Sequence, residues 1–161
     1  MKKTSIFLVL ILVLLMVSGC SDESKKEAPY ISLGLTTEQV SSNFQKVTNK
    51  PLSITIDSKT NKFEGHINDY LKVSGEINSK DNTVRSLNIT GTFAENDIKK
   101  SEVFLDSCLC FIEMFDSKLK PTESLSVMEK SMNKKPYSQN NRNYVFTSTS
   151  KTVQLSIQPQ K

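Results

Sequence analysis

Several residue types that often carry chemistry are scarce in this chain. The 161 residues include one histidine, three cysteines, five glycines and no tryptophan. So few cysteines exclude a disulfide-rich scaffold. The glycines form no Gly-x-Ser-x-Gly nucleophile elbow, no phosphate-binding loop and no dinucleotide fingerprint. The sequence therefore contains no signature of these enzyme classes.

Long apolar runs are also scarce, and the one present lies at the start of the chain. Two lysines precede the apolar run Ile6–Val17, and small residues then lead to a cysteine. This order is typical of a secretory signal, with a positive start, roughly 7–15 apolar residues and small residues at the cleavage site. The run is shorter than the ~20 residues that a membrane-spanning helix needs, and polar residues follow it directly.

The end of this segment is more specific. Val17-Ser18-Gly19-Cys20 resembles the lipobox of bacterial lipoproteins, in which an aliphatic residue, a small residue and Gly or Ala precede Cys. The resemblance implies cleavage between Gly19 and Cys20, and a diacylglyceryl group on the Cys20 thiol. Two acyl chains anchor a protein stably, whereas a single chain holds it only marginally. An ordinary secretion signal with an incidental cysteine is the alternative.

The lipobox resemblance predicts a location and a division of the chain. We expect residues 1–19 to be a lipoprotein signal peptide and residues 20–29 to be a lipidated cysteine followed by a polar tether. The tether reaches about 30 Å when fully extended. The domain would lie outside the cytoplasm on the cell membrane, or on the outer membrane if the source has two membranes. No second linker is evident, so we expect residues 30–161 to form a single domain.

The charge of the remaining chain gives no reason to expect nucleic acid as a partner. The precursor has a net charge of +4, but Lys2 and Lys3 would leave with the signal peptide. That leaves 19 basic and 17 acidic side chains, which is nearly neutral. An exported location argues further against a nucleic-acid partner.

The apolar periodicity predicts the order of the elements. Thr36 and Gln39 fit a capping box at the start of a helix that ends near Pro51. Period-two alternation then predicts strands at 52–56, 70–77 and 87–93, and a further short strand is expected near Phe63. Two helices follow at 98–119 and 121–132, and a C-terminal hairpin is expected to turn at 148–151.

This order is typical of an α+β fold. Strands and helices occur in separate blocks, which favours an antiparallel sheet with helices segregated to one face. We expect about five to six strands, with two or three helices packed on one face. The segment from Leu87 to Leu125 also resembles a pattern in small exported bacterial proteins that have no assigned activity, so this likeness implies no function.

The candidate chemical residues are few. His66 is expected in a turn-like stretch, where an exposed and inert histidine is the commonest outcome. Cys108 and Cys110 are two residues apart on the expected helix, so their sulfur atoms point in nearly opposite directions. We therefore expect both to pack as small apolar side chains rather than to form a redox pair or a metal site. No cofactor and no metal ligands are predicted.

The leading hypothesis is a lipid-anchored cell-envelope protein with a non-catalytic binding or scaffold domain. If the helices cover one face of the sheet, its polar face is the expected contact surface for an envelope or extracellular protein, with Tyr70, Lys72 and Glu76 as candidate binding residues. Two alternatives stay open. One is an enzyme that uses His66 on envelope material, and the other is an anchored inhibitor or exclusion protein.

Overall fold

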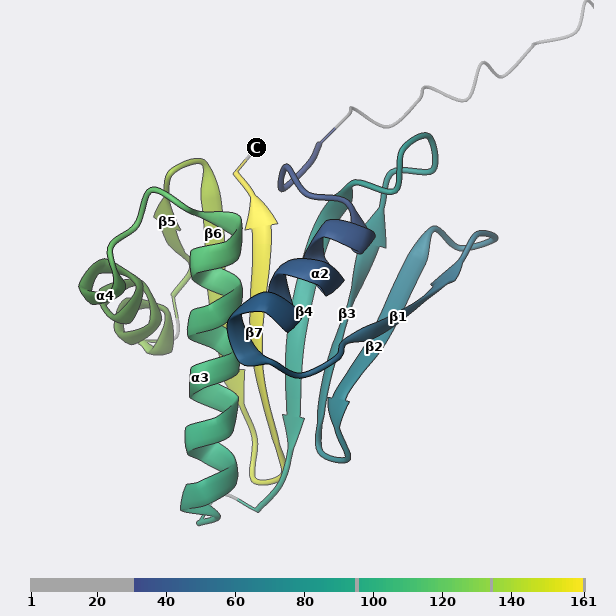
Figure 1. The fold of residues 1–161 in the computed structure, drawn as a ribbon. Helices are drawn as coiled ribbons and strands as arrows, with labels where there is room; N and C mark the ends of the chain where they lie inside the picture. The colour runs from purple at the N-terminus through teal and green to yellow at the C-terminus, as the bar shows by residue number, and fades with distance from the viewer. Residues whose placement is uncertain (1–30, 95, 134, 161) are drawn as a thin grey trace, which may run out of the picture.

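The computed structural model describes residues 31–94, 96–133 and 135–160. The predicted signal peptide, Gly19, Cys20 and the tether lie outside the described residues. In the described part of the chain, three helices lie on one face of a seven-stranded antiparallel sheet (Figure 1). This confirms the α+β class, although the sheet has one strand more than the upper end of the expected range.

The strands run across the sheet in the order β1-β2-β3-β4-β7-β6-β5. Their bounds in chain order are β1 Ser53–Asp57, β2 Lys62–Asn68, β3 Leu71–Ile77, β4 Val84–Thr92, β5 Tyr137–Gln139, β6 Arg142–Ser148 and β7 Thr152–Pro159. The strand not anticipated from the sequence is β5. It has three residues with no apolar periodicity of their own, and its place in the sheet comes from pairing with β6.

The first described helix, α2 (Thr37–Thr48), begins and ends as the sequence predicts. The Thr36 hydroxyl accepts a hydrogen bond from the Gln39 N–H at 3.3 Å, and the Gln39 side-chain oxygen accepts one from the Thr36 N–H at 2.9 Å. This reciprocal pair is the expected capping box. Asn49 then adopts a left-handed conformation with φ 55°, which ends the helix before Pro51.

The other two helices are α3 (Ile98–Phe115) and α4 (Pro121–Met132). Helix α4 occupies its predicted segment, whereas α3 begins as predicted but ends at Phe115 rather than at residue 119, because Asp116 leaves the helical conformation. Two apolar residues of these helices are largely exposed, Ile98 at 72% and Leu125 at 50%. Ile98 is the first residue of α3, and its side chain lies outside the packed core.

The core lies between the helices and the inner face of the sheet. In register across four strands, Gly75 of β3 lies beside Leu87, which pairs with Ile157 and then with Tyr144 of β6. The aromatic rings of Phe44 in α2 and Phe111 in α3 stack with their centroids 5.3 Å apart, which joins the two helices. These inner side chains are almost fully buried.

Cys108 and Cys110 belong to this core, as expected. Both are buried free thiols on α3. Burial raises the pKa of Cys108 well above its ordinary value. Burial, together with the nearby Glu113 carboxylate, raises the pKa of Cys110 to about 11. Both thiols therefore stay protonated near neutral pH, which makes them poor nucleophiles.

No helix in the described part of the chain is long and apolar enough to span a membrane.

Candidate functional site

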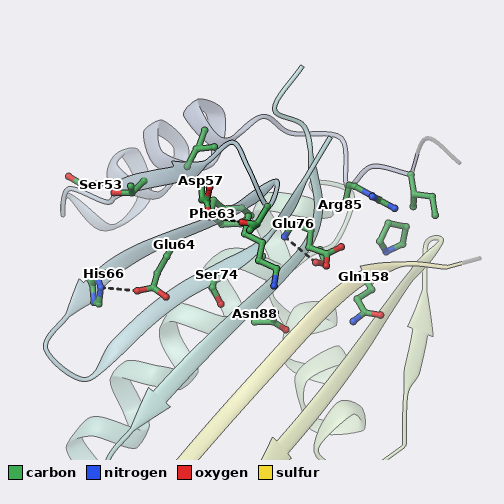
Figure 2. A pocket seen from close by; sticks show the side chains of 18 residues that line it. Ser53, Asp57, Phe63, Glu64, His66, Ser74, Glu76, Arg85, Asn88 and Gln158 are labelled. Atoms are coloured by element: carbon green, nitrogen blue, oxygen red, sulfur yellow. Dashed lines mark hydrogen bonds and ion pairs between the residues drawn. The ribbon is translucent and has the colours of Figure 1, made fainter. Parts of the chain in front are cut away.

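The face of the sheet opposite the helices holds a broad depression of about 1030 Å³ (Figure 2). We call this side of the sheet the open face. Its side chains alternate along each strand with the buried residues of the core. The polar residues that line the depression from five strands are Ser53, Thr55, Asp57, Lys62, Glu64, His66, Ser74, Glu76, Arg85, Ser86, Asn88 and Gln158, and Thr60 lines it from the turn after β1.

His66 lies at one side of the depression, on β2 rather than in the turn that the sequence suggested. Its Nε2 is 3.3 Å from Oε1 of Glu64. Nζ of Lys72, on β3, is 3.4 Å from the other oxygen of the same carboxylate. The His66 and Glu64 side chains are 69% and 51% exposed, so water screens both contacts and each contributes little to stability.

On the floor of the depression, hydrogen bonds connect polar side chains of neighbouring strands. Asn88 of β4 lies between Ser74 of β3 and Ser156 of β7 in register. Its side-chain oxygen accepts hydrogen bonds from the Ser156 hydroxyl and from the Gln154 amide, the latter at 3.0 Å. The Asn88 side chain is therefore held in one orientation by two donors from β7.

A second set of charges lies at the far side of the depression. Lys62 of β2 is in register between Asp57 of β1 and Glu76 of β3. The Asp57 carboxylate accepts hydrogen bonds from the Thr60 hydroxyl and the Lys59 N–H, and these bonds lower its pKa. The open face thus combines both signs of charge with hydroxyl and amide groups.

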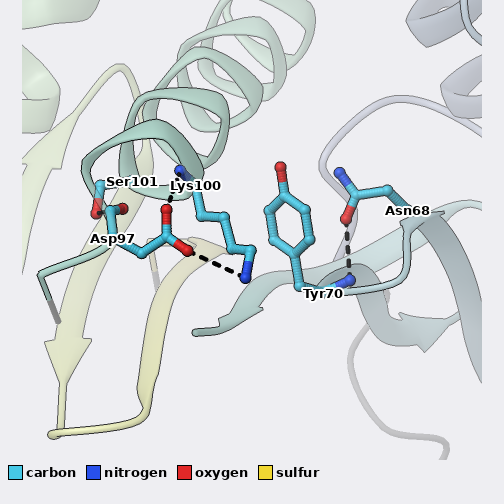
Figure 3. Close-up of polar contacts among 5 residues, drawn as sticks. All are labelled: Asn68, Tyr70, Asp97, Lys100 and Ser101. Carbon is cyan, nitrogen blue, oxygen red and sulfur yellow. Dashed lines mark hydrogen bonds and ion pairs between the residues drawn. The ribbon is translucent and has the colours of Figure 1, made fainter. Parts of the chain in front are cut away.

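Tyr70 does not belong to the open face. Its ring makes an edge contact with Phe93 and lies under Nζ of Lys100 on α3, 5.4 Å from the ring centroid (Figure 3). The strand alternation fails there because Asn68 forms a turn. The Asn68 side-chain oxygen accepts hydrogen bonds from the N–H groups of Tyr70 and Leu71. This turn directs the Tyr70 side chain towards the face of the sheet that the helices cover.

The candidate binding residues are therefore separated by the fold. Glu76 lines the depression, Lys72 borders it through its contact with Glu64, and Tyr70 lies on the other side of the sheet. Strands β2 and β7 also contribute polar side chains to the open face, which the candidate residues did not include. A signal for them was present, because Glu64 and His66 alternate with buried neighbours, as do Gln154, Ser156 and Gln158.

The chemistry available at the open face is hydrogen bonding and ion pairing. Among the described residues, no three His, Cys, Asp or Glu side chains lie close enough together to hold a metal ion. Ser53 is opposite His66 in register on β1. Glu64 supplies the only carboxylate that the described structure pairs with His66.

No protein-family model matches this chain, and no curated protein or solved structure shows significant similarity to it.

Proposed function

We infer that this chain is a lipid-anchored cell-envelope protein whose domain binds a protein partner and performs no catalysis. The lipobox resemblance at Cys20 supports the anchor. The observation that carries the binding role is the 1030 Å³ depression, which lies on the face of the sheet that the helices leave open. The partner would be a protein of the envelope or of the extracellular space.

The chemistry of the open face supports a protein partner. Protein surfaces present donors, acceptors and both signs of charge, and complementary placement of these groups gives specificity. Across the middle of the depression, Thr55, Glu64, Ser74 and Asn88 lie in register and offer hydroxyl, carboxylate and amide groups. The His66 imidazole lies on one side of this row, and the charged groups of Asp57, Lys62 and Glu76 lie on the other. An apolar small-molecule site would instead need a largely hydrophobic lining.

Catalysis by His66 remains the second candidate because the depression lies beside it. Glu64 can orient the imidazole, and Ser53 lies in register with it on β1. Against this candidate, register alone does not make Ser53 a nucleophile. Its hydroxyl would have to lie within hydrogen-bond reach of the His66 imidazole. The contact of His66 with Glu64 is also open to water, whereas catalytic electrostatics depend on water exclusion.

The binding proposal is tested by crosslinking on intact cells that produce the full chain. Ser74→Arg places a long side chain on the floor of the depression, and Ser117→Arg makes the same change at an exposed position just after α3. We expect Ser74→Arg to reduce the crosslinked partner at least tenfold, and Ser117→Arg to leave it unchanged. Circular dichroism would verify that both variants fold.

Two results would contradict the proposal. One is a partner that crosslinks equally to wild type and to the folded Ser74→Arg variant. The other is the absence of any crosslinked protein with wild type.

A further inference from the structure

The two edges of the sheet differ in how they are protected. The edge strand β5 has three residues, follows Pro136 and packs against α4, where Nζ of Lys130 lies 4.9 Å from the centre of the Tyr137 ring. The opposite edge strand, β1, has five residues with no proline, no lysine and no bulge. Proteins usually blunt an exposed edge by such devices. Within the part of the chain that the structure describes, β1 is therefore the edge left open to a further strand.

A groove runs along the outer side of β1. It measures about 500 Å³ and lies between β1 and α2. Ile54 and Ile56 line it from the strand, and both remain partly exposed there. A strand added to β1 would therefore gain backbone hydrogen bonds and cover two apolar side chains, which is the usual mode of strand addition.

The sequence of β1 is complementary to itself. If two copies pair antiparallel about Thr55, Ile54 of each copy faces Ile56 of the other, and Ser53 faces Asp57. Isoleucine pairs stabilise such a ladder, and no like charges are placed opposite each other. Both isoleucine pairs fall on the α2 side of the joined sheet, and the threonine pair falls on the open face.

Charge complementarity also favours a second copy. Ser53, His66 and Lys72 lie in register across β1, β2 and β3. Pairing about Thr55 would bring Asp57 of one copy to the end of this row in the other copy. A carboxylate would then extend a row that contains a lysine and a histidine, and the two open faces would become continuous.

We propose that β1 pairs antiparallel with β1 of a second copy of this chain, with Thr55 on the two-fold axis. The interface is isologous, since the same strand serves both copies. The proposed contact uses the backbone edge of β1 and the groove beside α2, although Ser53, Thr55 and Asp57 of the same strand also line the depression. It does not depend on the lipid anchor.

The test is disulfide trapping of the full chain carrying Thr55→Cys. Directly opposite residues in an antiparallel pair have Cα atoms about 4.5–5.5 Å apart, which suits a disulfide. We expect mild oxidation to give at least tenfold more disulfide-linked dimer than wild type gives. Ser138→Cys, an exposed position on the β5 edge, is the matched control and should stay at the wild-type level.

A second pair of variants tests the register. A mixture of Ser53→Cys and Asp57→Cys chains should crosslink severalfold more than either variant alone. Adding Ile54→Lys to Thr55→Cys should reduce the dimer at least tenfold, with folding verified by circular dichroism. The proposal is overturned if Thr55→Cys dimerises no more than Ser138→Cys, or if Thr55→Cys is captured only by another protein.

Discussion

At the scale of single residues, Gly75 shows how closely the sheet and its covering side chains fit. A Cβ atom at this position would lie 1.9 Å from the Ser86 carbonyl oxygen and 2.8 Å from the Phe63 ring. The ladder between β3 and β4 shifts register next to it, between Glu76 and Ile77. Because glycine has no Cβ atom, the Phe63 ring and the neighbouring β4 backbone can both pack closely against position 75.

Gly75→Ala is expected to be strongly destabilising. The added methyl group must displace backbone as well as the Phe63 ring, so we expect the free energy of unfolding to fall by about 3 kcal/mol. Chemical denaturation measures this value. Ser74→Ala, one residue away and facing the open side, should change it by no more than ~0.5 kcal/mol. Equal effects of the two substitutions would show that the close contact at Gly75 is unimportant.

Single residues are also where sequence reasoning succeeded and failed most clearly. The capping box at Thr36 and the packing of Cys108 and Cys110 follow from local spacing alone, and the structure confirms them. The side of the sheet on which Tyr70 lies does not follow from spacing. A hydrogen bond from the Tyr70 N–H to the Asn68 side-chain oxygen overrides the strand alternation there, and alternation alone cannot reveal it.

At the scale of elements, a polar junction joins the end of α3 to the β5–β6 turn. Asp116 is 3% exposed, and its carboxylate accepts a 2.7 Å hydrogen bond from the Asn140 amide. The same oxygen is 4.0 Å from the Arg142 guanidinium. Burial raises the pKa of neighbouring Tyr144 to about 12, with a further contribution from Asp116. The phenol therefore stays neutral while the carboxylate and the guanidinium attract each other.

Asp116→Ala should weaken this junction. It leaves Arg142 partly buried without its carboxylate, and we expect a loss of about 2–3 kcal/mol in the free energy of unfolding. Asp106→Ala removes an exposed carboxylate from α3 and should cost no more than ~0.5 kcal/mol. Thermal or urea unfolding of both variants measures the two losses of unfolding free energy. A loss of similar size in both would mean that the junction does not stabilise the fold.

The elements that could be predicted from the sequence are those whose apolar pattern repeats over many residues. Leu71–Ile77 alternates over seven residues, and α3 repeats its apolar positions over several turns, so both patterns are unambiguous. The strand β5 was missed because three residues after a proline show no period. Its formation depends on the neighbouring strand β6, to which it pairs in register.

At the scale of the whole molecule, one face of the sheet is covered and the other is open. The three helices bury the apolar side, and the polar side keeps its charged and hydroxyl groups in water (Figure 1). The alternation in the sequence predicted this division of faces. The depression itself was not predictable, because side chains from five separate strands have to come together to line it.

The central claim is that Cys20 attaches this domain to a membrane, while Cys108 and Cys110 serve only packing. The measurement that tests it most directly is incorporation of a labelled fatty acid into the full chain in bacterial cells, followed by membrane fractionation. The wild type and Cys110→Ala should both carry the label and remain with the membranes, whereas Cys20→Ala should carry none and leave the membrane fraction. A labelled, membrane-bound Cys20→Ala variant, or an unlabelled wild type, would contradict the account.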